Sequence, residues 1–283
     1  MKKVHAISFW EKHKNLVCGF STKALGNISF RTGDRDAVRK NKEALAEELG
    51  ISWSEVIVLP LSHSNRVLSL PERTVITKDD SGVYASGGRV FTPRAILVHD
   101  NPEWQSGIDA VVTNIKGLFP TIMSADCAAV GFFDPVNKVI AMAHAGLIGA
   151  INKIIPNTVE CMTKEYGSDP ENIKVVIFPS IRKCHYDLKA SGAWKRIRRD
   201  SLAHYGQSDV IFADDKFDLH GLLFRQLADS GIKAENVHDT RLCTVCNRDM
   251  FFSNLAASSA EAKRIEGRFA SIMGVKNETK KTH

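Results

Sequence analysis

The sequence predicts a mixed α/β (α+β) protein built as a single domain. Short apolar segments typical of strands follow one another directly between residues 109 and 145, and helical patterns are interspersed among strands without strict alternation. No repeat, low-complexity linker or charge run marks a domain boundary. The 283 residues, 43% hydrophobic and 25% charged, lie in the ordinary globular range. We therefore assign residues 1–275 to one domain and residues 276–283 to a polar tail.

The first half of the chain contains a predicted helix and several strands. Residues 36–49 are predicted to be helical because acidic residues open the segment and Gly50 follows it. An apolar strand over 56–61 leads directly into Ser62 and His63. Residues 71–107 carry many turn-forming residues and should form short strands and loops. Residues 109–114 and 118–123 are predicted to be two further strands.

The second half mixes helices with short strands. Helical spacing of apolar residues runs over 146–166, where Pro156 should kink or restart the helix. We expect a strand at 174–178, a helix around 190–204 and a strand at 210–213. A final helix over 219–230 has Asp218 as its N-cap and Gly231 as its stop.

A predicted hairpin between residues 124 and 146 is the most informative segment. Its turn, Asp134-Pro135-Val136-Asn137, has proline at the position that a type I turn favours. If Asp134 pairs with Asn137, Cys127 lies directly opposite His144, with their Cβ atoms about 5 Å apart. A bulge after Asn137 would shift this register by one residue. The predicted pair suits two ligands of one metal ion, or a thiol beside its base.

His63 is the candidate third ligand. It follows an apolar strand, and the small residues Ser62 and Ser64 leave room around its imidazole. Two histidines and one cysteine form a three-ligand site with an open fourth position, which is typical of catalytic zinc. Such an ion lowers the pKa of its bound water or polarises a substrate oxygen. From the residues alone, a small core cysteine and structural histidines remain the alternative interpretation.

Two further groups of cysteine and histidine residues give weaker evidence for a functional site. Cys243 and Cys246 form an isolated CxxC, which without a second pair is weak evidence for metal binding or redox chemistry. We expect it to pack beneath Phe251 and Phe252. Cys184 and its neighbour His185 either line the catalytic cleft or play a buried structural role.

Charge and composition narrow the choice of partners. The net charge is +6 and the pI is near 9.0, which suits anionic ligands such as phosphate. The densest basic cluster, residues 195–199, is interpreted as a solvated helix face, and no nucleic-acid-binding motif is present. No apolar run approaches the roughly 20 residues that span a bilayer, so no membrane association is expected. The start of the chain does not resemble a signal peptide, and six scattered cysteines do not form a disulfide framework. These features predict a cytoplasmic protein.

Several short motifs, taken in order, resemble the laccase-domain family, whose members are also described as purine nucleoside phosphorylases, multicopper polyphenol oxidoreductases and peptidoglycan-editing factors. The resemblance spans roughly residues 16 to 275 and is specific as a set. The matching segments are Gly19-Phe20-Ser21-Thr22, Asp109-Ala110-Val111-Val112-Thr113-Asn114, Ser124-Ala125-Asp126-Cys127, Ala143-His144-Ala145-Gly146, Pro179-Ser180-Ile181, Cys184, Leu242-Cys243-Thr244, Cys246 and Phe251-Phe252-Ser253.

The resemblance implies a fold of stacked α/β/β/α layers with mixed sheets, related to a cytotoxic deamidase toxin with a Cys–His active site. It implies a zinc ion held by His63, Cys127 and His144, with copper as an alternative metal. It also implies phosphorolysis of purine nucleosides to the free base and ribose 1-phosphate, together with deamination of adenosine. Cys127 and His144 are accordingly the predicted catalytic residues, and a purine nucleoside and phosphate are the predicted substrates.

The sequence departs from the family pattern at the positions that usually carry arginine. Lys23 replaces an early arginine, and Leu147-Ile148 replaces a Trp-Arg pair. Two arginines expected after Phe-Phe-Ser are Asn254-Leu255, and a cysteine expected after Cys184 is His185. The usual Gln-x-His-Gly reads Leu61-Ser62-His63-Ser64.

Phosphorolysis requires cations that hold phosphate, and lysine does not reproduce a bidentate arginine contact. We predict Lys23 and Arg66 as substitutes. Two other functions stay open: a Cys–His amidase or deamidase acting on peptide-like or peptidoglycan-precursor substrates, and a metal-binding paralogue with little turnover. The sequence leaves the oligomeric state open.

Overall fold

The computed structural model describes residues 1–8, 12–79, 82–86, 89–91, 107–187, 199, 212–213, 216–257 and 266–277. Within these residues most strands form a five-stranded and a seven-stranded sheet, each with parallel and antiparallel pairs. Along the first sheet the order is β1 (Val4–Ala6), β2 (Leu16–Ser21), β16 (Phe269–Val275), β9 (Phe119–Ser124), β3 (Val56–Val58). Along the second sheet it is β15 (Val237–Asp239), β12 (Lys174–Ile177), β10 (Ala128–Asp134), β11 (Val139–Ala145), β8 (Ala110–Thr113), β4 (Val67–Leu70), β7 (Arg89–Phe91).

The remaining elements are helices and two small hairpins. The helices are α1 (Arg35–Leu49), α2 (Leu147–Ile151), α3 (Ile154–Tyr166), α5 (Leu219–Asp229) and the 3-10 turns η1 (Trp53–Glu55), η3 (Pro170–Asn172), η4 (Ala234–Asn236). The hairpins pair β5 (Val75–Asp79) with β6 (Gly82–Ser86) and β13 (Phe212–Ala213) with β14 (Lys216–Phe217).

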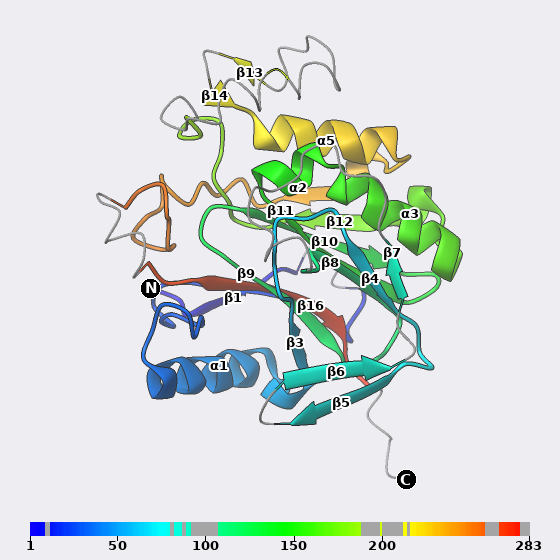
Figure 1. Cartoon of the computed structure of the whole chain (residues 1–283), viewed down its shortest axis with the longest axis horizontal. Coiled ribbons are helices and arrows are strands. Elements are labelled where there is room, and N and C mark those ends of the chain that lie inside the picture. Colours follow the sequence, from blue (N-terminus) through cyan, green and yellow to red (C-terminus); the bar gives the residue numbers. More distant parts are fainter. Residues whose placement is uncertain are drawn as a thin grey trace.

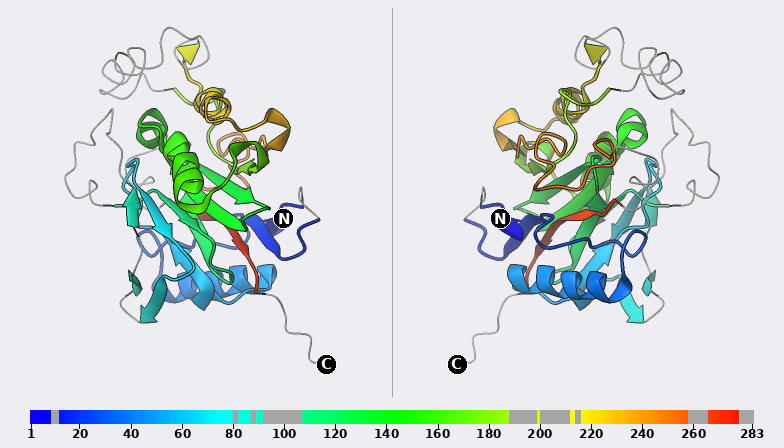
Figure 2. Two further views of the ribbon diagram at one scale, coloured as in Figure 1. Left: turned by 90° about the vertical axis from the view of Figure 1, so that its right-hand side faces the viewer. Right: turned by 90° about the vertical axis from the view of Figure 1, so that its left-hand side faces the viewer.

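The two sheets stack face to face, with α1 outside the first sheet and α2, α3 and α5 outside the second (Figures 1 and 2). Three apolar layers hold this arrangement together. Residues of β2, β9 and β16 pack against β10 and β11 between the sheets, helices α2, α3 and α5 pack against the outer face of β10–β12, and α1 packs against the first sheet. Burial of these side chains is the main stabilising contribution. The α/β/β/α expectation is confirmed.

Local signals placed most helices and strands correctly. Asp218 caps α5 by accepting a hydrogen bond from the Gly221 N–H, and Gly50 ends α1 in the left-handed conformation. The predicted helix over 146–166 is interrupted at Lys153 (φ 66°), and Pro156 lies in the first turn of α3, where proline is tolerated. The strand predicted over 56–61 is shorter, ending at Val58. The predicted helix around 190–204, with its basic cluster, falls outside the described residues apart from Arg199, as does the start of the strand predicted at 210–213.

The register of the β10–β11 hairpin differs from the prediction by two residues. Asp134 pairs with Val139, so that His144 lies opposite Ala129 and not opposite Cys127. The reason is the turn, which holds four residues between the strands. The Asp134 carboxylate accepts hydrogen bonds from the Val136 and Asn137 N–H groups, and a left-handed Lys138 (φ 57°) closes the loop. Because side chains alternate with period two, Cys127 and His144 still point to the same face, as diagonal neighbours.

Candidate functional site

Cys127 lies between β9 and β10, directly after a residue with an unusual backbone. Asp126 has φ 100°, a left-handed conformation that is costly for a non-glycine residue. Its carboxylate accepts hydrogen bonds from Thr244 Oγ1 at 2.6 Å and the Leu255 N–H at 2.8 Å. The Ile181 N–H donates to the Asp126 carbonyl at 2.8 Å. These contacts stabilise the turn that presents the half-buried Cys127 thiol.

His144, near the end of β11, is oriented by a buried carboxylate. Its Nδ1 lies 2.8 Å from Oδ1 of Asp109, and its backbone N–H donates to the Asp109 carbonyl at 2.7 Å. Both side chains are almost inaccessible to solvent, at 3% and 0% exposure. A carboxylate that accepts the Nδ1 proton leaves the Nε2 lone pair available as a metal ligand or base.

Asp109 also shapes the loop that carries His63. Its carboxylate accepts hydrogen bonds from the His63 N–H at 3.0 Å, from the Ser64 N–H at 2.6 Å and hydroxyl at 2.7 Å, and from Ser62. These bonds stabilise the left-handed backbone of His63 (φ 59°). Burial alone would raise the pKa of Asp109, but the bonds from His144 and Ser64 lower it to about 2. Asp109 is therefore a buried anion that holds both the His144 ring and the loop around His63 in place.

The three predicted ligands meet. The donor atoms of His63, Cys127 and His144 all lie within 4.8 Å of one another, and the two imidazole rings stand at 68° with centroids 5.1 Å apart. Gly146 provides the room, because a Cβ at that position would lie 2.9 Å from the Cys127 sulfur. Two nitrogens and one sulfur suit zinc or copper and leave a position open. The donor set fits the predicted metal; the assignment of these side chains as ligands stays a prediction.

Without a metal, the same groups form a thiol–imidazole pair. Burial would raise the pKa of Cys127, but the charge and hydrogen bond of His144, with a smaller contribution from His63, lower it to about 6. Burial would likewise lower the pKa of His144, but Cys127 and Asp109 raise it to about 10. Both shifts favour a thiolate paired with an imidazolium, and a metal ion would displace the imidazolium proton.

The two predicted substrate-binding cations occupy different surroundings. Lys23 donates to the Arg248 carbonyl at 2.8 Å, lies 3.9 Å from Glu266 and stacks over the Phe252 ring. It lines a pocket of about 310 Å³ whose lining residues include none of the three candidate ligands. Arg66 directly precedes β4 beside the site, where its carbonyl accepts hydrogen bonds from the Asp109 and Ala110 N–H groups. Its role in binding phosphate stays a prediction.

Two neighbours of the cluster are missing from the sequence-based prediction. The first is Asp109, although an acidic residue that opens an apolar strand is a recognisable signal. The second is Arg268, which precedes β16 and whose guanidinium donates to the Glu266 and Gly267 carbonyls at 2.7 and 2.9 Å. Burial lowers the pKa of Arg268, and the negative charges of Cys127 and Asp126 oppose that shift. Arg268 therefore lies within electrostatic range of the thiolate.

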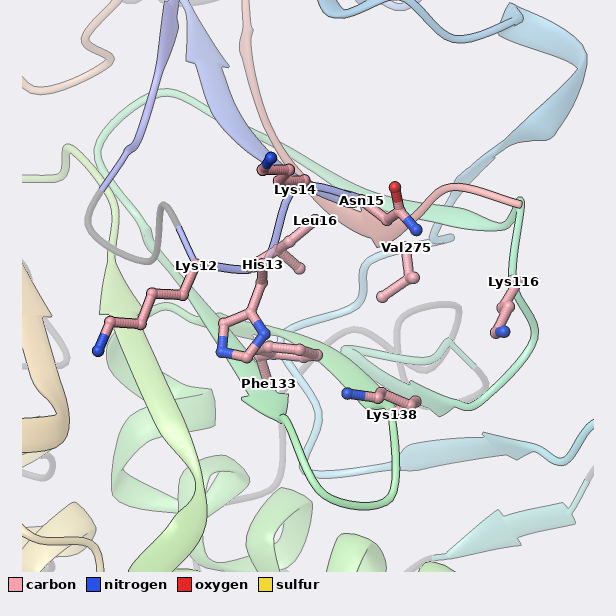
Figure 3. Close-up of a pocket in the computed structure, with 9 residues that line it drawn as sticks. All are labelled: Lys12, His13, Lys14, Asn15, Leu16, Lys116, Phe133, Lys138 and Val275. Carbon is pink, nitrogen blue, oxygen red and sulfur yellow. The ribbon is translucent and has the colours of Figure 1, made fainter. Parts of the chain in front are cut away.

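Another pocket lies elsewhere, at the opposite end of the β10–β11 hairpin. It has a volume of about 410 Å³ and gathers Lys12, Lys14, Lys116 and Lys138 around Phe133 (Figure 3). Phe133 and Lys138 lie at the turn end of the β10–β11 hairpin, whereas Cys127 and His144 lie at its other end. At roughly 3.3 Å per residue, about 20 Å separates the two places. This basic pocket is not the cleft of the Cys–His cluster.

Comparison with known proteins gives a consistent result. The chain is 27% identical over 278 residues to the purine nucleoside phosphorylase YlmD of Bacillus subtilis, covering 94% of this chain and 91% of the relative. It is 24% identical over 261 residues to the adenosine deaminase RL5 of an unknown prokaryotic organism, covering 89% of each chain. The crystal structure of the hypothetical protein YfiH of Bacillus licheniformis superimposes with a TM-score of 0.73 at 23% identity, covering 98% of this chain and 97% of that one.

Fold and site together define a two-sheet α/β protein with a metal-competent Cys–His centre at one end of its central hairpin. The chain belongs to the multi-copper polyphenol oxidoreductase laccase family, whose model matches residues 17–276. The names of its relatives support an enzymatic role in purine nucleoside chemistry at the level of the family. Among the described helices, none has both the length and the apolar character needed to cross a membrane.

Proposed function

We propose that this protein is a zinc-dependent purine nucleoside phosphorylase that also deaminates adenosine. The observation that carries the proposal is the convergence of His63, Cys127 and His144 to within 4.8 Å. The names of the relatives supply the substrate class. We further propose that the enzyme works in the cytoplasm, since none of its six cysteines is in a disulfide.

The chain's own groups have definable tasks in this chemistry. A zinc ion bound by the three side chains supplies Lewis acidity and a water of lowered pKa. Asp109 holds the His144 proton on Nδ1, so that Nε2 stays aimed at the cluster. Deamination replaces the 6-amino group of adenosine with the oxygen of water and releases ammonia. Phosphorolysis joins phosphate to the anomeric carbon and releases the base.

Phosphate and the departing base both need positive charge nearby. Arg268 is the best candidate among the described residues, because it is half-buried and senses the Cys127 and Asp126 charges. Arg66 is the second candidate through its place beside Asp109. Lys23 is the weakest, because the lining of its pocket includes none of the three candidate ligands.

A nucleoside assay tests the proposal. Purified protein incubated with adenosine and phosphate should yield adenine and ribose 1-phosphate, and inosine should form with or without phosphate. Cys127→Ala should lower both activities by at least about 100-fold, since the ligand set loses its thiolate. Cys161→Ser, a buried cysteine outside the cluster, is the matched control. Zinc-loaded wild-type protein that converts no nucleoside would instead identify the metal-binding paralogue.

The lowered pKa of Cys127 favours a second candidate, a Cys–His amidase or deamidase with peptide-like or peptidoglycan-precursor substrates. In metal-stripped protein, we expect alkylation of Cys127 by iodoacetamide to rise with a midpoint near pH 6 and to level off above it. The sign follows from the thiolate, which forms as pH increases through the pKa. Rapid stoichiometric trapping of Cys127 in protein as isolated would support this candidate. If Cys127 reacts with iodoacetamide only after a chelator has removed the metal, the result would support the zinc-dependent function.

A further inference from the structure

A second cluster of metal-binding side chains lies outside the candidate active site. Cys184 and His185 come from the turn after β12, and Cys243 and Cys246 come from the turn after β15. The donor atoms of all four lie within 4.8 Å of one another. The expectation that the CxxC packs beneath phenylalanine rings is wrong for Cys246, which is exposed together with Cys184. The isolated CxxC therefore has its second pair of ligands 58 or more residues earlier in the chain.

The spacing of these atoms matches a tetrahedron around zinc. Bond lengths of about 2.3 Å to sulfur and about 2.0 Å to nitrogen place neighbouring sulfurs about 3.8 Å apart, and sulfur and nitrogen about 3.5 Å apart. The sulfur of Cys184 lies 3.6 Å from that of Cys243 and 3.7 Å from that of Cys246. Nδ1 of His185 lies 3.2, 3.8 and 3.5 Å from the sulfurs of Cys184, Cys243 and Cys246. Five of the six edges therefore agree within a few tenths of an ångström.

Disulfide bonding does not explain this arrangement. A disulfide requires about 2.05 Å between sulfurs, whereas the sulfurs here are 3.6 Å or more apart where their separation is defined.

We propose that Cys184, His185, Cys243 and Cys246 bind a second, structural zinc ion. Four protein ligands close the coordination sphere, which is typical of structural zinc and unlike the three-ligand cluster of the candidate active site. The ion would join two turns that the fold also connects by the short bridge between Ser180 and Cys243 and by the ion pair between Arg182 and Asp239. The proposal does not depend on the proposed nucleoside chemistry.

The second site borders the loop that presents Cys127. Thr244, inside the CxxC, donates to the Asp126 carboxylate at 2.6 Å, and Ile181, three residues before Cys184, donates to the Asp126 carbonyl at 2.8 Å. Both turns that supply the zinc ligands therefore hold the strained residue next to the candidate catalytic cysteine. The second zinc would rigidify this support from outside the active site.

Metal analysis of the purified protein tests the proposal. Wild-type protein expressed in zinc-supplemented medium should contain about two zinc ions per chain, and Cys246→Ser and Cys127→Ala should each contain about one. His185→Ala should also lose one ion, whereas His185→Cys should retain it, because a fourth thiolate completes the tetrahedron. Cys161→Ser, outside both clusters, should keep both ions.

A spectroscopic measurement on the wild type covers the case in which a variant does not fold. X-ray absorption at the zinc edge should fit an average of about two sulfur ligands per ion, from one site with three and one with a single sulfur. A wild-type protein with one zinc in a one-sulfur environment would overturn the proposal, as would a folded Cys246→Ser that keeps the full zinc content. Loss of nucleoside activity with unchanged zinc content would count against the proposed function and not against the second zinc site.

Discussion

Asp109→Asn is expected to remove most of the zinc from the candidate active site and to destabilise the fold. The asparagine amide keeps the shape of the side chain but loses the charge that orients His144 and accepts bonds from the 62–64 loop. Loss of such an outer-shell partner typically lowers metal affinity roughly 10- to 100-fold. Removing one member of a buried charged pair costs about 3 kcal/mol of unfolding free energy. Elemental analysis and denaturant unfolding measure the two effects.

The pH dependence of the unfolding free energy shows whether the charge of Asp109 stabilises the fold. The pKa of Asp109 is lowered to about 2 in the folded protein, against an ordinary value near 3.8. Its contribution to stability is therefore complete above about pH 4 and is lost as pH falls from 4 towards 2. Asp109→Asn should lack this component of the acid-induced loss of stability.

Asp134→Asn is the matched control for Asp109→Asn. Asp134 is also a buried carboxylate with a lowered pKa, and it accepts backbone bonds at the opposite end of the same hairpin. The Asp134→Asn substitution should destabilise the protein without changing the zinc content of the candidate active site. Equal zinc loss in the two variants would contradict the positioning role of Asp109.

Gly146→Ala is expected to disrupt the same site by crowding. The added Cβ would lie 2.9 Å from the Cys127 sulfur and 3.3 Å from Cδ2 of His63, so at least one ligand must move. A displacement of about 1 Å at a reacting centre costs on the order of 100-fold in rate. We therefore expect nucleoside turnover to fall by about that factor and zinc to dissociate more readily during dialysis against a chelator.

Gly167→Ala provides the comparison for this glycine substitution. Gly167 ends α3 with φ +70°, and a Cβ there would meet no atom within 4 Å. The substitution should therefore cost about 1 kcal/mol through backbone strain while leaving zinc content and turnover unchanged. Full activity in Gly146→Ala would show that the sulfur does not occupy the position described here.

Features encoded by neighbouring residues could be predicted, and features set by packing could not. The cap at Asp218, the stop at Gly50 and the helix restart near Pro156 depend on a few adjacent residues, and each was predicted correctly. The hairpin register was wrong because it depends on Lys138 adopting a left-handed backbone, which nothing in its side chain demands.

The candidate sites show the same division. His63, Cys127 and His144 were singled out from strand ends and a family resemblance, and the structure brings them together. The role of Asp109 depends on three chain segments that meet around one carboxylate, which the local sequence does not show. The partners of the CxxC were overlooked for a related reason, since only the parallel pairing of β12 and β15 brings the turns that follow them side by side.

The pairing of β10 with β11 restricts how this hairpin can vary among relatives. A one-residue slip of β11 against β10 would turn His144 from the face between the sheets toward α2 and α3. A two-residue slip would keep the facing but move the imidazole about 7 Å along the strand relative to the thiol. Relatives with turns of different length should therefore take up the difference in the loop and keep the pairing of the two strands.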